Sequence, residues 1–89
     1  MNWNVNLNQD TYKDIPEYVI SSLERYIEHR TPPGSFVAAI LENDLFTAIG
    51  RADTESLKAL KGIVTLIHCH VRGDCWGNKE NVKDWLKGS

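Results

Sequence analysis

The sequence has little that would direct it to a membrane or to a nucleic acid. No apolar run approaches the roughly 20 residues that a membrane-spanning helix needs. The chain has 10 basic and 12 acidic residues and a net charge of −2, so no basic excess favours binding to a nucleic-acid backbone. No acidic run suggests a mimic of DNA charge. The sequence therefore predicts neither a membrane protein nor a nucleic-acid-binding protein.

The first residues also lack the basic start and apolar stretch of a signal peptide. We therefore expect a cytoplasmic protein, in which the only two cysteines, Cys69 and Cys75, are free thiols because that compartment is reducing. The chain has only 89 residues, which is enough for one domain with a modest core. Such a core supplies only a few kcal/mol of net stability, so a homo-oligomer that buries more apolar surface is expected.

Most of the chain shows helical spacing of apolar residues. The first predicted helix has its apolar residues at Ile15, Val19, Leu23, Tyr26 and Ile27. Asp14 and Glu17 have the spacing of a capping box, and Pro16 fits the first turn. The segment Thr31–Gly34 ends this helix, because its two prolines cannot continue it.

Two short helices are predicted next. Ser35 is a good N-cap for a helix over Phe36–Glu42, and Asp44 for a helix over Leu45–Ile49, which Gly50 ends. Both are apolar on nearly every side, so we expect them in the centre of the fold.

Asp53 or Thr54 caps the longest predicted helix. Its apolar stripe consists of Leu57, Leu60, Val64, Ile67 and Val71. Ile63 and Leu66 widen the stripe, which predicts that the helix is sandwiched or lies at an interface. The segment 63–71 is also rich enough in β-formers to be a strand. After a loop at 73–77, Asn78 caps a last helix, whose inward side chains are Val82, Trp85 and Leu86.

The first 11 residues form an N-terminal extension. Trp3, Val5 and Leu7 alternate with asparagines, which is the period of a strand. Asparagine is a poor strand former, so a short strand and a mobile tail both remain open. Residues 12–89 are predicted to be one all-α domain, a compact bundle of four to five short helices.

Four residues are candidates for a ligand site. Ser35 opens a helix, whose free N–H groups attract anions, and Arg30 and Arg51 could bind a phosphate. Trp76 lies in a glycine-flanked loop, where an aromatic ring can stack on a base. Together they would suit a nucleotide-like ligand. In the competing structural interpretation Ser35 is only a cap, Arg51 pairs with Asp53, and Trp76 fills the core.

The segment His68–His70 with Cys75 is the only cluster with metal-ligand chemistry. On a helix, residues two apart point in different directions, so His68 and His70 would not share an ion, although on a strand they could. The same residues could serve a cysteine nucleophile, but no glycine-rich nucleophile turn supports it. We therefore predict no metal, no cofactor and no catalytic residues.

Five motifs together resemble a family of small proteins encoded by phages and prophages. They are Glu24–His29, Pro32–Phe36, Asn43–Leu45, Gly50–Asp53 and Cys75–Gly77. The resemblance covers about residues 15–86, and the His-Cys-His segment does not belong to it. It carries over no catalytic or binding residue. It implies an accessory protein in the cytoplasm of a bacterial host that blocks a host factor or sequesters a nucleotide-like signal used in defence.

Two alternatives to that function stay open. The first is a homo-oligomeric regulatory or interaction protein without a small ligand, assembled through the helix at Leu57–Val71. The second is a small metal- or cysteine-dependent hydrolase centred on His68, His70 and Cys75.

Overall fold

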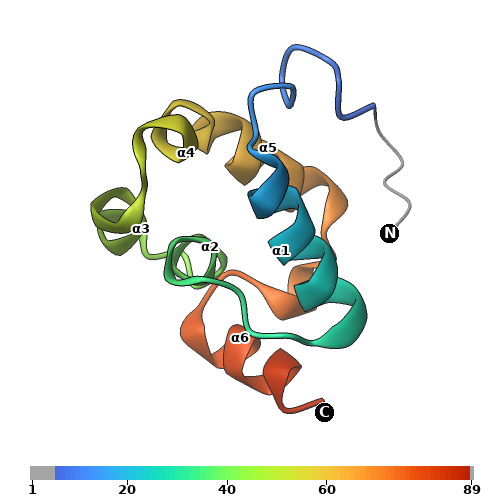
Figure 1. The fold of residues 1–89 in the computed structure, drawn as a ribbon. Coiled ribbons are helices and arrows are strands. Elements are labelled where there is room, and N and C mark those ends of the chain that lie inside the picture. The colour runs from blue at the N-terminus through green and yellow to red at the C-terminus, as the bar shows by residue number, and fades with distance from the viewer. Residues whose placement is uncertain (1–5, 89) are drawn as a thin grey trace.

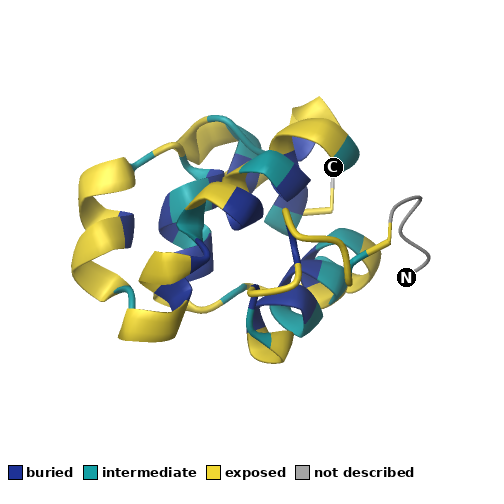
Figure 2. Ribbon diagram, turned by 90° about the horizontal axis from the view of Figure 1, so that it is seen from above, coloured by how far each residue is buried: buried dark blue, intermediate teal, exposed yellow. Residues whose placement is uncertain are grey.

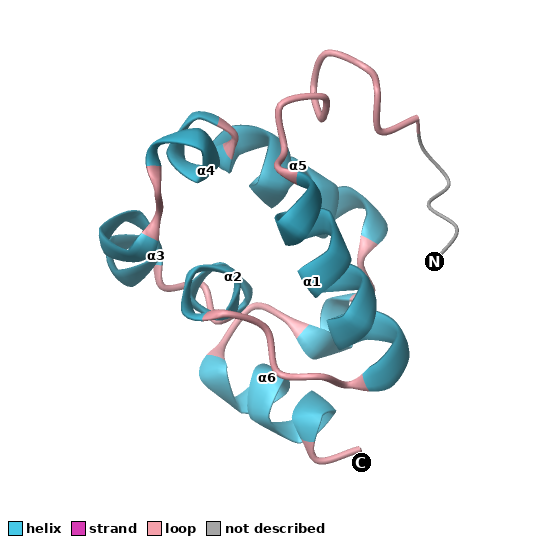
Figure 3. Ribbon diagram, viewed as in Figure 1, coloured by secondary structure: helices cyan, strands magenta, loops and turns pink. Residues whose placement is uncertain are grey.

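The computed structural model describes residues 6–88 and is all-α over that range, as predicted. Its helices are α1 (Glu17–His29), α2 (Ser35–Leu41), α3 (Leu45–Arg51), α4 (Thr54–Lys58), α5 (Leu60–His70), a short 3₁₀ turn η1 (Gly73–Cys75) and α6 (Lys79–Leu86) (Figure 1; Figure 3). None of the helices in this range is long and apolar enough to cross a membrane. Trp3 and Val5 of the predicted strand lie outside the described residues. Leu7 lies in a turn, so the strand is not present there.

The segment before α1 packs on α5. Tyr12 and Ile15 are buried, and Leu7 is partly buried against the same core. The backbone of Thr11 passes so close to Gly62 of α5 that a Cβ at that position would overlap the Thr11 carbonyl oxygen. Glycine is required at this contact because it has no side chain.

Tyr26 joins α1 to the C-terminal part of the chain. Its side chain is fully buried, and its hydroxyl donates to the carbonyl of Cys75 at 2.6 Å. The indole N–H of Trp85 on α6 donates to the Tyr26 carbonyl at 2.7 Å. Tyr26 therefore uses both its side chain and its backbone to hold η1 and α6 against α1.

α2 lies in the middle of the helices, as predicted, but α3 does not (Figure 1). Phe36, Val37, Ala39 and Leu41 of α2 are buried. In α3 only Ala48 is buried, and the rest of the helix is exposed (Figure 2). The prediction that both helices are central is therefore wrong for α3, which contributes only Ala48 to the core.

The longest predicted helix is divided into α4 and α5 at Ala59. Ala59 has φ −92° and ψ 2°, and no proline or glycine marks the break. As a result the predicted stripe is not wholly buried: Leu57 and Val64 are exposed, while Ile63, Leu66 and Ile67 face the core. The alternative of a strand over 63–71 is wrong, since α5 covers nearly all of it.

The caps agree only in part with the predictions. Asp44, Asp53 and Asn78 each accept a hydrogen bond from a backbone N–H of the helix that they precede. The capping box of Asp14 is not formed, because the N-cap of α1 is Pro16 and no side chain bonds there.

Two further helix-end predictions are wrong. Ser35 is the first residue of α2 and makes no cap hydrogen bond, because the N-cap is Gly34. Gly50 does not end α3, which runs on to Arg51.

Tyr26→Phe should lower the free energy of unfolding by about 1–3 kcal/mol, because the buried carbonyl of Cys75 loses its donor. Urea unfolding measures this change. Tyr12→Phe is the matched control, since the Tyr12 hydroxyl makes no hydrogen bond with another described residue. It should change stability by less than about 0.5 kcal/mol. Equal losses in the two variants would contradict this role of Tyr26.

Gly50→Ala and Gly62→Ala should have opposite effects on stability. Both glycines are helical, and nothing lies near a Cβ at Gly50, so alanine there should stabilise by about 0.5–1 kcal/mol. At Gly62 the new methyl group would meet the Thr11 carbonyl, so the variant should be destabilised. Thermal melts of the two proteins test this, and stabilisation of both would show that Thr11 does not pack on α5.

Candidate functional site

The four candidate ligand residues are not assembled into one site. Arg30 caps α1 and donates from Nη1 to the Trp85 carbonyl at 2.9 Å. Its guanidinium also lies 3.7 Å from the centroid of the Trp85 ring, a cation–π contact. Arg30 therefore has a structural role. Trp76 lines a different cavity from Ser35 and Arg51, so it does not stack on a ligand held by them.

Ser35 and Arg51 do share a cavity, of about 420 Å³, which we call the arginine pocket. Three residues of α1 line it as well: Tyr18, Ser22 and Arg25. They are four and three residues apart, so they lie on one face of the helix. The pocket therefore brings two arginines and three serines together from α1, α2, α3 and α4.

One wall of the arginine pocket is a small hydrogen-bond network. The Tyr18 hydroxyl lies 2.5 Å from the Asp53 carboxylate, to which it donates, and 2.6 Å from the Ser56 hydroxyl. Asp53 also accepts from the backbone N–H of Ser56 at 2.7 Å. The bonds from Tyr18 and Ser56 lower the pKa of Asp53, and its carboxylate in turn raises the pKa of Tyr18. The network fixes α4 against α1.

Arg25 and Arg51 have no ion-pair partner among residues 6–88. The predicted pairing of Arg51 with Asp53 is not formed, because the Asp53 carboxylate is directed to Tyr18 and Ser56. Arg72, by contrast, makes two hydrogen bonds of 2.7 Å to Asp74. The two arginines of the pocket thus keep their donors available.

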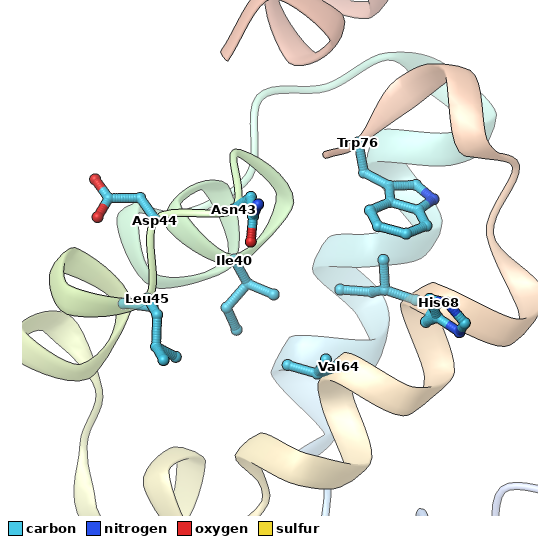
Figure 4. Close-up of a pocket in the computed structure, with 9 residues that line it drawn as sticks. Ile40, Asn43, Asp44, Leu45, Val64, His68 and Trp76 are labelled. Atoms are coloured by element: carbon cyan, nitrogen blue, oxygen red, sulfur yellow. The ribbon is translucent and has the colours of Figure 1, made fainter. Parts of the chain in front are cut away.

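A second cavity, of about 270 Å³, is an apolar groove between α2 and α3 on one side and α5 on the other (Figure 4). Its apolar lining residues are Ile40, Leu45, Ala48, Val64, Ile67 and Trp76. Trp76 closes one end, where its ring meets His68 edge-on at 6.0 Å and its indole N–H donates to the Val71 carbonyl. In Figure 4 the carboxylate of Asp44 points away from the groove.

Large apolar side chains stand exposed on α3, beside the groove. Phe46 is 92% exposed, and Leu45 and Ile49 are 55% and 45% exposed. Val64 is also exposed on the opposite wall. We call these four side chains and the groove the α3 surface. Several large apolar side chains exposed on one short helix are typical of an interaction site on a folded protein.

The three candidates for a metal or cysteine site, His68, His70 and Cys75, each contact a different part of the structure. His68 contacts Trp76, while His70 contacts Tyr12 edge-on at 6.2 Å. Cys75 is fully buried, its Sγ donates to the Arg72 carbonyl at 3.3 Å, and burial raises the pKa of its thiol. Within the described chain, no three histidine, cysteine or acidic side chains gather as metal ligands. A thiol held in this way is a poor nucleophile.

No protein-family model, curated protein or solved structure matches this chain. The resemblance to phage proteins stays a prediction, and the two cavities carry the functional argument.

Sequence reasoning missed Arg25 and the exposure of Phe46. The polar spacing of Tyr18, Ser22 and Arg25 on one helical face was a usable signal for the first. The exposure of Phe46 had no local signal, because an apolar helix predicts burial until the packing of its neighbours is known.

Stability should depend on the ionisation of Asp53. Because its pKa in the folded state is below the value of about 4 for an unfolded chain, its carboxylate stabilises the fold above that pH. The contribution is lost as the pH falls through the folded pKa. Asp53→Asn should therefore be less stable than the wild type near neutral pH, with a difference that shrinks in acid. Urea unfolding across this pH range measures it.

Tyr18→Phe is the control for that experiment. It removes the hydroxyl that contributes most to lowering the pKa of Asp53, so it should weaken the same acid dependence. Parallel stability curves for the wild type and Asp53→Asn would refute the assignment.

Proposed function

We propose that this chain is a small accessory protein that acts by binding rather than by catalysis, and that it binds a protein through the α3 surface. The observation that carries this proposal is the exposure of Phe46, 92%, on the same short helix as Leu45, which lines the apolar groove. The fully buried thiol of Cys75, whose Sγ donates to the Arg72 carbonyl, argues against Cys75 as a catalytic nucleophile.

The energies show why the whole α3 surface has to take part. Full burial of one large apolar side chain contributes about 1.5–3 kcal/mol, while association costs at least about 4 kcal/mol. Phe46 alone cannot hold a partner. Burial of Leu45, Ile49 and Val64 together with Phe46 can exceed the cost of association, and these side chains lie on two facing helices.

A second copy of the chain is the occupant that the geometry favours. The α3 surface contains both a projecting side chain, Phe46, and a groove able to receive one. A twofold axis would place the Phe46 of each copy in the groove of the other, which is the self-complementary contact of a symmetric dimer. In this arrangement the interface is formed by α3 and the groove rather than by the helix at Leu57–Val71 alone.

A host protein is the second candidate, favoured by the resemblance to phage accessory proteins. Such a partner would insert an apolar helix into the groove, a common mode of recognition. This protein would then act by occupancy, in the cytoplasm of a bacterial host, and would inhibit the factor whose helix it covers.

Phe46→Ser tests the proposal. Sedimentation equilibrium should show a dimer for the wild type and a monomer for the variant, because the projecting ring is lost. The thermal stability of the monomeric unit should barely change, since Phe46 is almost fully exposed and exposed substitutions usually stay within about 0.5 kcal/mol. Leu57→Ser, at an exposed apolar residue outside the groove, is the control and should remain dimeric.

A wild type that stays monomeric at millimolar concentration would rule out the second copy. The host-protein candidate then requires a purified partner whose binding is lost in Phe46→Ser and kept in Leu57→Ser. Dimers of equal strength in both variants would show that the α3 surface is not the interface.

A further inference from the structure

We propose that the arginine pocket binds a small phosphate ester that also has hydroxyl groups, such as a nucleotide or a sugar phosphate. This site is separate from the α3 surface and does not depend on the function proposed for it. The volume of the pocket, about 420 Å³, is within the usual range for small-molecule sites, about 300–1,000 Å³.

The charges of the pocket favour an anion. Arg25 and Arg51 both line it, and neither has an ion-pair partner among the described residues. Arg30 and Arg72, in contrast, are engaged with Trp85 and Asp74. Two arginines that line one cavity can each bind a phosphate through paired, charge-assisted hydrogen bonds.

The hydroxyls of the pocket are available for the same ligand. Ser35 does not cap α2, and neither Ser35 nor Ser22 makes a side-chain hydrogen bond with another described residue. Each hydroxyl can donate to a phosphate oxygen while it accepts elsewhere. Two arginines and these two serines, from α1, α2 and α3, thus line one cavity.

Asp53 restricts which anion fits. Its carboxylate accepts one hydrogen bond on each oxygen, from Tyr18 and from the Ser56 N–H, and each oxygen has a further lone pair. An anion bound at the arginines is repelled by this carboxylate unless the ligand also donates an O–H to it. A ligand with a phosphate at the arginines and a hydroxyl at Asp53 gains from both, which favours an ester over inorganic phosphate.

The experiment is titration calorimetry of the full chain with inorganic phosphate, ribose 5-phosphate, adenosine monophosphate and adenosine, at constant ionic strength. At least one phosphate ester should bind about tenfold or more tightly than inorganic phosphate, and adenosine should not bind. Tighter binding of adenosine monophosphate would indicate a nucleotide ligand, and tighter binding of ribose 5-phosphate would indicate a sugar phosphate. Equal affinity for the esters and inorganic phosphate would mean an adventitious ion only and would overturn the proposal.

Variants place the ligand in the pocket. Arg25→Gln and Arg51→Gln should each lower the affinity for the ester about tenfold or more, because each removes a charge-assisted contact. Arg72→Gln removes the same charge from an exposed arginine outside the pocket and should bind as the wild type does. Circular dichroism of each variant should show an unchanged fold. Equal losses in all three variants, or no loss in either pocket variant, would overturn the proposal.

Discussion

The fold depends on the reciprocal attachment of Tyr26 to the C-terminal part of the chain. Its hydroxyl bonds to the Cys75 carbonyl, and its own carbonyl accepts from Trp85. Arg30, the C-cap of α1, places its guanidinium over the Trp85 ring. These contacts join residues about 50 to 60 positions apart in sequence and are largely buried. In so short a chain, buried hydrogen bonds of this kind decide where the last helix lies, because the apolar area alone supplies little net stability.

With η1 and α6 fixed against α1, the core takes only Ala48 from α3. α2 lies among these helices, and most of its apolar side chains are buried. In α3, by contrast, Leu45, Phe46 and Ile49 are exposed to solvent. Asp44 caps α3 and holds its first turn. The exposed apolar side chains therefore lie on a short helix of defined position. Beside it is the groove, whose opposite wall is formed by Val64, Ile67 and His68 of α5. A partner would meet a preformed surface, which keeps the ordering cost of binding low.

The two proposed sites lie at different places on the molecule and would bind their ligands through different interactions. The α3 surface offers apolar area and shape, whereas the arginine pocket offers unpaired charge and hydroxyl groups. Arg51, the last residue of α3, belongs to the arginine pocket, while Leu45, the first residue of the same helix, lines the groove. The seven-residue helix α3 therefore contributes one of its ends to each site.

The sequence by itself determined the helical class, the break at Thr31–Gly34, and the caps at Asp44, Asp53 and Asn78, because periodicity and capping are local properties. It also grouped Ser35 and Arg51 with Arg30 and Trp76, and of these four only Ser35 and Arg51 line a common cavity. Tertiary structure alone decided that Arg30 packs on Trp85 and that Trp76 lies at the groove, since those contacts join distant segments. Tertiary structure also decided which apolar helix remains exposed to solvent. The local sequence shows that a side chain is apolar, but its burial depends on how the other helices pack around it.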